Sequence, residues 1–175
     1  MIRTSCPFVT RSTRNSPCGP SSRYATVAVP LRLDADNVDA LLAGHDLIID
    51  GCDSFTTRLL VADSALAARV PLVSGAVGPF DGQVAVFKGF DPALPCYRCF
   101  VGNPEDQPER NCAAVGVLGA LTGVIGSLTA TEAIRELSGF SPSSAGRITL
   151  FDAMAGRFRT LSLPKDPACP ACSAQ

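Results

Sequence analysis

The chain has 175 residues, 46% of them hydrophobic, so it can bury a core and is expected to form one domain. Its 15 basic and 16 acidic residues give a net charge of −1, which removes any electrostatic reason to expect nucleic acid or a membrane as partner. His45 is the single histidine, which excludes a histidine-rich metal site and any triad that needs a second histidine.

The first 23 residues differ from the rest in composition. They carry four arginines and many Ser and Thr residues but no acid, and their apolar residues follow no period of 2 or 3.6. Such a segment is predicted to be disordered. It also fits an organelle transit peptide, but we favour a non-native or truncated leader.

Order is predicted to begin near Tyr24. Residues 24–33 alternate loosely, as a strand does, and Asp36–Ala43 is a short helix candidate with Asp34 or Asp36 as its cap. The apolar run Leu47–Ile49 is rich in β-branched residues, which is typical of a buried parallel strand.

A helix is predicted over Phe55–Arg69, because apolar residues recur there at helical spacing and Pro71 stops it. Leu72 begins the next strand. A strand, a helix and a strand in this order form a parallel, right-handed βαβ unit.

The pattern changes after Gly75. Two kinds of element are expected there, a long helix over Ala113–Leu137 closed by Gly139, and strands over Gly82–Lys88, Arg147–Asp152 and Phe158–Leu163. The last two strands flank a turn at Ala155-Gly156. The predicted fold is therefore an α/β domain with a Rossmann-like sheet that is parallel at first and has antiparallel C-terminal strands.

The long helix raises the question of a membrane span, because residues 112–131 contain no charge. Four glycines and several hydroxyl groups in this stretch argue against a span, and it runs directly into Glu132 and Arg135. We favour a helix buried in a core or at a subunit interface.

Four of the eight cysteines form two C-x-x-C pairs, Cys96/Cys99 and Cys169/Cys172. Two such pairs suit a tetrahedral Zn²⁺, and four thiolates leave no open position, so the zinc would be structural. The rival interpretation is a thioredoxin-like redox pair, but that motif opens a helix, whereas Pro95 and Pro170 indicate loops. Free thiols in this number indicate a reducing compartment, hence the cytoplasm.

Two more residues are candidates for chemistry. Asp53 follows the carboxyl end of a parallel strand, where open α/β sheets bind ligands, so it either holds Mg²⁺ on a nucleotide or caps the next helix. Cys112 lies at the expected start of the long helix, whose dipole favours a thiolate, but its local sequence favours a buried, inert cysteine. Cys52 is expected to pack in the core behind the strand.

These motifs, taken together, resemble one enzyme family in order and spacing over residues 24–172. It comprises the adenylyltransferases of molybdopterin and thiamine biosynthesis (the ThiF type), which are relatives of ubiquitin-activating enzymes. The resemblance is carried by Asp50-Gly-Cys-Asp53-Ser-Phe-Thr-Thr-Arg58, Pro71-Leu-Val-Ser-Gly-Ala76, Gly82-Gln-Val-Ala-Val-Phe87, Pro95-Cys-Tyr-Arg-Cys99, Asn111-Cys112, Gly116-Val-Leu-Gly119, Gly123-Val-Ile-Gly-Ser127 and Cys169-Pro-Ala-Cys172.

The resemblance implies an enzyme that uses Mg-ATP to adenylate the C-terminal glycine of a ubiquitin-like sulfur-carrier protein, which then becomes a thiocarboxylate. Asp53 matches the family's magnesium and nucleotide aspartate, and Ser54 stands where the family usually has Asn. Cys112 matches a cysteine that forms a covalent link in some members. The cysteine quartet matches the structural zinc ligands, and the long helix matches a region that helps to bury a homodimer interface.

One family feature is absent from the sequence. No strand followed by G-x-G-x-x-G precedes Tyr24, so residues 24–175 are expected to be a partial adenylyltransferase domain that is inactive alone. The alternative is a non-catalytic, zinc-stapled module for carrier binding or dimerisation. A nicotinamide-dependent dehydrogenase is disfavoured, because its dinucleotide fingerprint is missing too.

Overall fold

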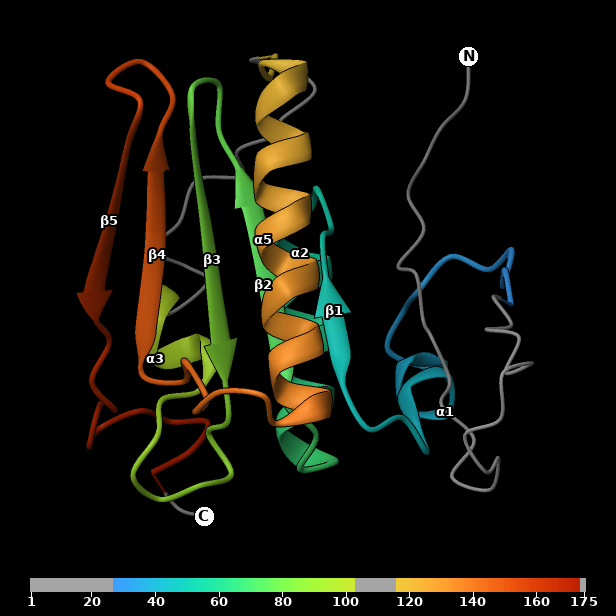
Figure 1. Cartoon of the computed structure of the whole chain (residues 1–175). Coiled ribbons are helices and arrows are strands. Elements are labelled where there is room, and N and C mark those ends of the chain that lie inside the picture. Colours follow the sequence, from blue (N-terminus) through green and yellow to red (C-terminus); the bar gives the residue numbers. More distant parts are fainter. Residues whose placement is uncertain (1–26, 103–115, 174–175) are drawn as a thin grey trace.

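A five-stranded mixed sheet forms the middle layer of the protein, seen here in a computed structural model that describes residues 27–102 and 116–173 (Figure 1). The strands lie side by side in chain order. β1 and β2 are parallel, and every later pair is antiparallel. The predicted change from parallel to antiparallel pairing is confirmed. The strands are β1 (Ile48–Asp50), β2 (Leu72–Val77), β3 (Asp81–Phe87), β4 (Arg147–Asp152) and β5 (Arg157–Ser162).

Helix α2 (Phe55–Ala67) connects β1 to β2, close to the predicted range. Ser54 has an extended backbone at the N-cap, and its Oγ accepts the Thr57 N–H at 3.4 Å, as N-cap serines do. The helix ends two residues earlier than predicted, because Arg69 adopts a left-handed φ of 57° before Pro71.

Helix α5 (Gly119–Ser138) covers the opposite face of the sheet, over β2 and β3 (Figure 1). Two glycines in these strands allow the helix to approach closely. A Cβ atom on Gly75 would lie 2.5 Å from Thr129 Oγ1, and one on Gly82 would lie 2.4 Å from Ile125 Cγ1. Gly139 ends the helix with a left-handed φ of 64°, as predicted.

The helix was predicted to start at Ala113 and therefore to include residues 116–118, and this prediction is wrong. Residues 116–118 lie outside the helix, and Leu118 has extended backbone. Glycine at 116 and 119 weakens a first turn, so the helix begins six positions later than its apolar pattern suggests. Among the described residues, no helix is long and apolar enough to cross a membrane.

The start of the described chain also differs from expectation. Residues 27–33 form no strand and are mostly exposed, because no neighbouring strand pairs with them. Helix α1 (Val38–Leu42) confirms the short helix, and Asp34 Oδ1 accepts N–H groups from Asp36 and Asn37 just ahead of it. Residues 1–23, with Cys6 and Cys18, lie outside the described residues.

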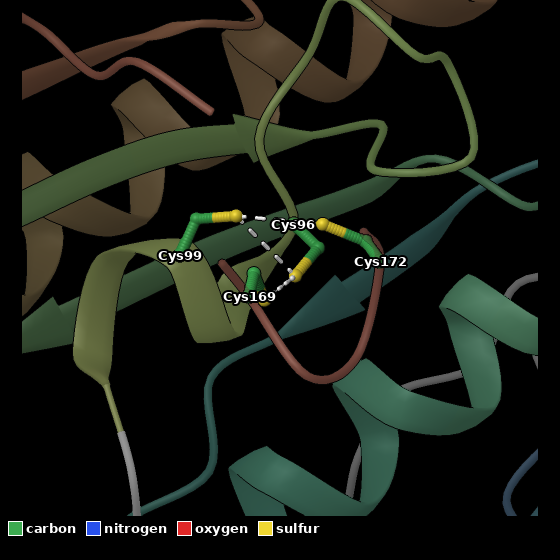
Figure 2. Close-up of side chains that lie close together, drawn as sticks. All are labelled: Cys96, Cys99, Cys169 and Cys172. Atoms are coloured by element: carbon green, nitrogen blue, oxygen red, sulfur yellow. Dashed lines mark hydrogen bonds between the residues drawn. The ribbon is translucent and has the colours of Figure 1, made fainter. Parts of the chain in front are cut away.

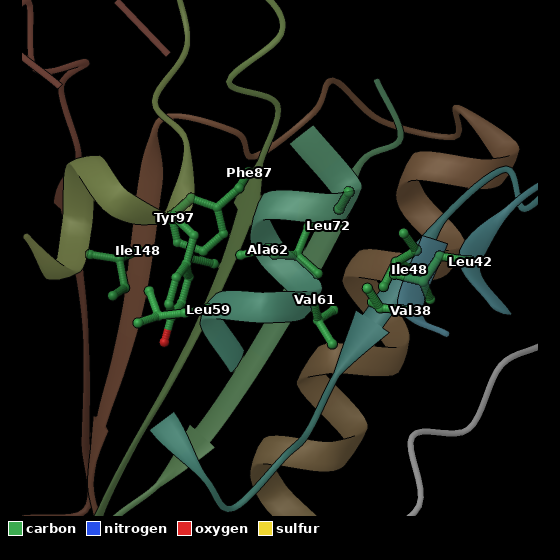
Figure 3. Packing of buried hydrophobic residues seen from close by; sticks show 12 residues of the cluster. Val38, Leu42, Ile48, Leu59, Val61, Ala62, Leu72, Phe87, Tyr97 and Ile148 are labelled. Carbon is green, nitrogen blue, oxygen red and sulfur yellow. The ribbon is translucent and has the colours of Figure 1, made fainter. Parts of the chain in front are cut away.

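Alternation along the strands produces one hydrophobic core on each face of the sheet. Leu72 and Phe87 point to the face covered by α1, α2 and α3 (Tyr97–Val101), which carries the larger cluster (Figure 3). Val73 and Val86 point to the other face, where they pack beneath Leu121 and other residues of α5. The sheet is therefore packed between helices on both of its faces.

Candidate functional site

The two cysteine pairs meet at one end of the sheet. Cys96 is the N-cap of α3 and Cys99 lies within α3, while Cys169 and Cys172 belong to a turn near the C-terminus. The Cys96 sulfur lies 3.7 Å from that of Cys99 and 3.6 Å from that of Cys169, and the Cys99 and Cys172 sulfurs are 3.5 Å apart (Figure 2). All four sulfurs lie within 4.8 Å of one another.

This geometry fits a tetrahedral metal. Zinc–sulfur bonds of about 2.3 Å place neighbouring sulfurs about 3.8 Å apart, close to the distances above. Three of the four cysteines are buried, so the centre is shielded from water. A zinc ion here would have no position left for substrate and would supply cross-linking rather than catalysis.

The environment of the thiols is compatible with ionisation only as a group. Burial raises the pKa of the Cys96 thiol. Burial also opposes ionisation of Cys169, but the backbone N–H groups of Ala171 and Cys172, together with the thiols of Cys96 and Cys99, outweigh it and lower the Cys169 pKa. N–H groups aimed at a sulfur are what a C-x-x-C turn offers to a metal-bound thiolate.

One argument for zinc from the sequence is wrong. Pro95 was expected to keep the first pair in a loop, yet Cys96 does open a helix, the five-residue α3. A helix start alone therefore does not separate the redox interpretation from the metal one. The convergence of four reduced cysteines does, because a redox pair needs only two.

A second group of polar side chains lies at the opposite end of the sheet, where β1 and β2 end. Asp50, the last residue of β1, is 1% exposed. Its Oδ2 accepts hydrogen bonds from Arg58 Nη1 at 2.7 Å and from Ser74 Oγ at 2.9 Å. Arg58 Nη2 also donates to the Gly75 carbonyl at 2.9 Å. The network fixes α2 to the ends of both parallel strands.

Sequence reasoning did not single out this Asp50–Arg58 network. Asp50 and Arg58 entered it only as the two ends of a family motif. The available signal was a carboxylate at the end of a buried strand followed, in the first turn of the next helix, by an arginine.

The network borders a cavity of about 370 Å³ between the β1–α2 loop and α5. Asp53 is exposed and lines this cavity, so the structure places it where a ligand can reach it. Ser54 does not line the cavity and serves as the cap of α2. The wall from α5 consists of small and apolar residues: Thr122, Ile125, Gly126, Thr129 and Ala130.

Cys52 was expected to pack in the core, and this expectation is wrong. It is half-buried and lines the same cavity, with its N–H donating to Asp50 Oδ1 at 2.9 Å. Burial first, and then the Asp50 carboxylate, raise its pKa to about 12. The thiol therefore stays protonated near neutral pH and is a poor nucleophile.

Cys112, the candidate nucleophile, lies outside the described residues. The structure nevertheless removes one reason for choosing it. Helix α5 begins at Gly119, with the non-helical residues 116–118 before it, so the N-terminus of α5 is not at Cys112. The Cys112 role stays a prediction.

Fold and site together define an α/β protein with an open mixed sheet, a largely apolar cavity with Asp50, Asp53 and Arg58 in its lining, and a four-cysteine centre able to hold a metal. The profile of the ThiF family matches residues 20–171. The chain belongs to the ThiF family.

Known relatives agree with this membership. The chain is 44% identical over 151 residues to a Thermus thermophilus sulfur carrier protein adenylyltransferase, covering 83% of this chain and 55% of the relative. It is 39% identical over 148 residues to the Escherichia coli molybdopterin-synthase adenylyltransferase, covering 85% of this chain and 59% of the relative. The chain therefore spans little more than half the length of these relatives.

Solved structures share the fold. The crystal structure of E. coli MccB with ATP superposes with a TM-score of 0.66, at 14% identity, over 83% of this chain and 45% of that chain. At this identity the similarity shows the common architecture only.

Proposed function

We propose that this chain forms part of an ATP-dependent adenylyltransferase that activates the C-terminal glycine of a ubiquitin-like sulfur-carrier protein. The observation that carries the proposal is the cavity at the ends of β1 and β2, with Asp53 on its rim and the fixed Asp50–Arg58 network behind it. The names of two relatives, a sulfur carrier protein adenylyltransferase and a molybdopterin-synthase adenylyltransferase, support this reaction. The pathway would be that of the molybdenum cofactor or a related sulfur pathway such as that of thiamine.

In the proposed reaction, a carboxylate oxygen of the carrier's terminal glycine attacks the α-phosphorus of ATP. The bond from that phosphorus to the bridging oxygen breaks, and pyrophosphate leaves with the electron pair. Asp53 would hold Mg²⁺, which supplies positive charge to the phosphates. Because Arg58 is engaged by Asp50, Ser74 and Gly75, it holds the Asp50–Asp53 loop in place instead of meeting the triphosphate.

Cys112 would act after adenylation. Its sulfur would attack the acyl carbon of the carrier adenylate, AMP would leave, and a covalent carrier–enzyme link would form. A Cys112→Ala variant is therefore a control that spares the first step and loses the link.

The first prediction concerns ATP–pyrophosphate exchange with a carrier protein that ends in glycine. The 175-residue chain contains no G-x-G-x-x-G loop to neutralise a triphosphate, so it is expected to exchange at background. When its residues replace the matching segment of the E. coli relative, exchange is expected to appear. Asp53→Ala in that chimera should lower exchange about 100-fold, because the Mg²⁺ that would offset the negative charge of the phosphates loses its protein ligand.

Two controls give this assay its meaning. Cys112→Ala should leave exchange intact, and metal content should be equal in all variants. Exchange that survives Asp53→Ala would contradict the role of Asp53. Robust exchange by the 175-residue chain itself would show that the missing glycine-rich loop is not needed.

The second candidate function is a non-catalytic module that binds the carrier. Three exposed apolar side chains at the cavity end of the sheet favour a protein partner there: Phe80, Leu118 and Met154. Their turns are joined, because the Ala153 N–H donates to the Phe80 carbonyl and the Leu118 N–H to the Pro79 carbonyl. Carrier binding without exchange by the chimera would favour this function.

We also propose a homodimer that uses the outer face of α5. Ile134 and Leu137 are 58% and 57% exposed there, beside small residues that allow close helix packing. Ile134→Glu is expected to weaken association about 100-fold, because it places a charge in an apolar contact. Sedimentation velocity would measure this, with Met154→Glu as a control for added charge elsewhere. A monomer at all concentrations before mutation would contradict the proposal.

We infer a cytoplasmic location from the same cysteines. Four sulfurs within bonding distance of one metal must stay reduced, and this requires a reducing compartment. Fractionation of the native cells would test it, and recovery of the chain with its cysteines oxidised would contradict it.

A further inference from the structure

Helix α2 joins the two ends of the sheet that carry the sites. Its first turn holds Arg58 beside the cavity, and Ser54 caps that turn. Its last two turns reach the metal centre, where Leu66 is buried in one cluster with Cys96, Cys169 and Cys172. A change at the metal centre can therefore reach the cavity through a single rigid element.

Arg98, inside the first cysteine pair, holds α2 from the metal side. Its Nε donates to Asp63 Oδ1 at 2.8 Å and its Nη2 to Asp63 Oδ2 at 2.6 Å. This is a bidentate pair, the arrangement in which an arginine fixes orientation as well as distance. Four thiolates around one divalent zinc carry a net charge of about −2, so a guanidinium next to them also balances charge.

Tyr97, the other residue inside that pair, packs against the same helix. It is 6% exposed and lies edge-on to Phe87, with ring centroids 5.3 Å apart. It belongs to the buried cluster that contains Leu59 and Ala62 of α2 (Figure 3). Tyr97 and Arg98 thus each join α3 to α2.

We propose that Tyr97 and Arg98 are positioning residues that couple metal binding to the geometry of the Asp50–Arg58 network and of the Asp53 loop that follows it. With the metal bound, Cys96 and Cys99 fix the only turn of α3. The two residues between them then place the Tyr97 ring in the cluster with Leu59 and Ala62 of α2 and the Arg98 guanidinium on Asp63. Without the metal, the turn of α3 is no longer held in place, and α2 loses its contacts with Tyr97 and Arg98.

Cys52 offers a reporter that needs neither nucleotide nor carrier. It lines the cavity and its N–H is bonded to Asp50, so its access to solvent depends on the network. Its alkylation can be followed separately from the other cysteines by mass spectrometry of peptides after pulse labelling. Removal of the metal is expected to raise the Cys52 alkylation rate about tenfold, because alkylation needs the thiolate and local opening relieves the burial that keeps this thiol protonated.

Variants that keep the metal separate coupling from general loosening. Arg98→Met and Tyr97→Leu, zinc-loaded, are each expected to raise the Cys52 rate about threefold, since each removes one of the two contacts that join α3 to α2. Arg98→Lys should raise the Cys52 rate less than Arg98→Met does, because lysine keeps the positive charge but cannot form the bidentate pair with Asp63. The control is Glu136→Gln, which breaks the Lys88–Glu136 ion pair on the α5 side and should leave the Cys52 rate unchanged.

The outcome that overturns the proposal is clear. If metal removal frees the four cysteines for alkylation while the Cys52 rate stays within about twofold, the centre does not control the cavity. This arm uses unmutated protein, so it stands even if a variant fails to fold. The coupling itself does not depend on the proposed function. Only its consequence for nucleotide binding rests on that function. Failed exchange with a positive Cys52 result would reject that function alone.

Discussion

Stripping the metal from the four-cysteine centre is expected to release the C-terminal tail while the sheet stays folded. Structural zinc in such centres contributes on the order of 10 kcal/mol, and the tail has little else to hold it. Its cysteines form a small cluster with Leu66, separate from the two cores on the sheet. Lys165 adds only two long contacts, at 3.5 Å, to the carbonyls of Gly89 and Asp91.

Limited trypsin digestion measures this release. Cleavage after Lys165 should accelerate on the order of 100-fold in a strong chelator, because the tail then opens freely, and added zinc should reverse it. Cys172→Ser should behave like the chelated protein, whereas Cys52→Ser, which removes a thiol outside the centre, should not. Elemental analysis of purified protein should find about one zinc per chain. Cleavage that is unchanged in the chelator would contradict a metal staple.

The second large effect is expected for Asp50→Ala. This change leaves the Arg58 guanidinium, whose side chain is 12% exposed, without its carboxylate partner. Breaking one half of a buried ion pair costs about 3–5 kcal/mol, a large share of the stability of a domain this size. Urea unfolding followed by far-UV circular dichroism is the appropriate measurement, since the sequence has no tryptophan.

Asp53→Ala provides the matched control, three residues further along the same loop. Asp53 is exposed and no buried group depends on it among the described residues, so the free energy of unfolding should change by less than about 0.5 kcal/mol. On this expectation Asp50 serves the fold, and Asp53 keeps the ligand role proposed above. Equal loss of stability in both variants would contradict this division.

Much of the fold could be predicted because its elements are marked locally. The apolar run at Leu47–Ile49, the helix stopped before Pro71 and the C-terminal hairpin each follow from spacing and turn residues, and all are present. The strand expected at residues 24–33 failed because alternation alone does not supply a pairing partner. The start of α5 failed because apolar glycines read as helix in a pattern but cost a first turn.

The sites divide in the same way. The two cysteine pairs are recognisable by their C-x-x-C spacing, so their convergence could be expected from the sequence. The Asp50–Arg58 network could not, because its third member, Ser74, lies on another strand and only the parallel register of β1 and β2 brings it into contact.

The four-cysteine centre and the cavity lined by Asp53 occupy opposite ends of one sheet. A bulky protein seated over Phe80 and Met154 would therefore leave the thiols untouched, and both ends can be occupied at once. Cobalt(II), which accepts the same tetrahedral donors as zinc, could fill the four-cysteine centre as a coloured probe. Its absorption would report on that end of the molecule while a ligand is titrated into the cavity at the other end.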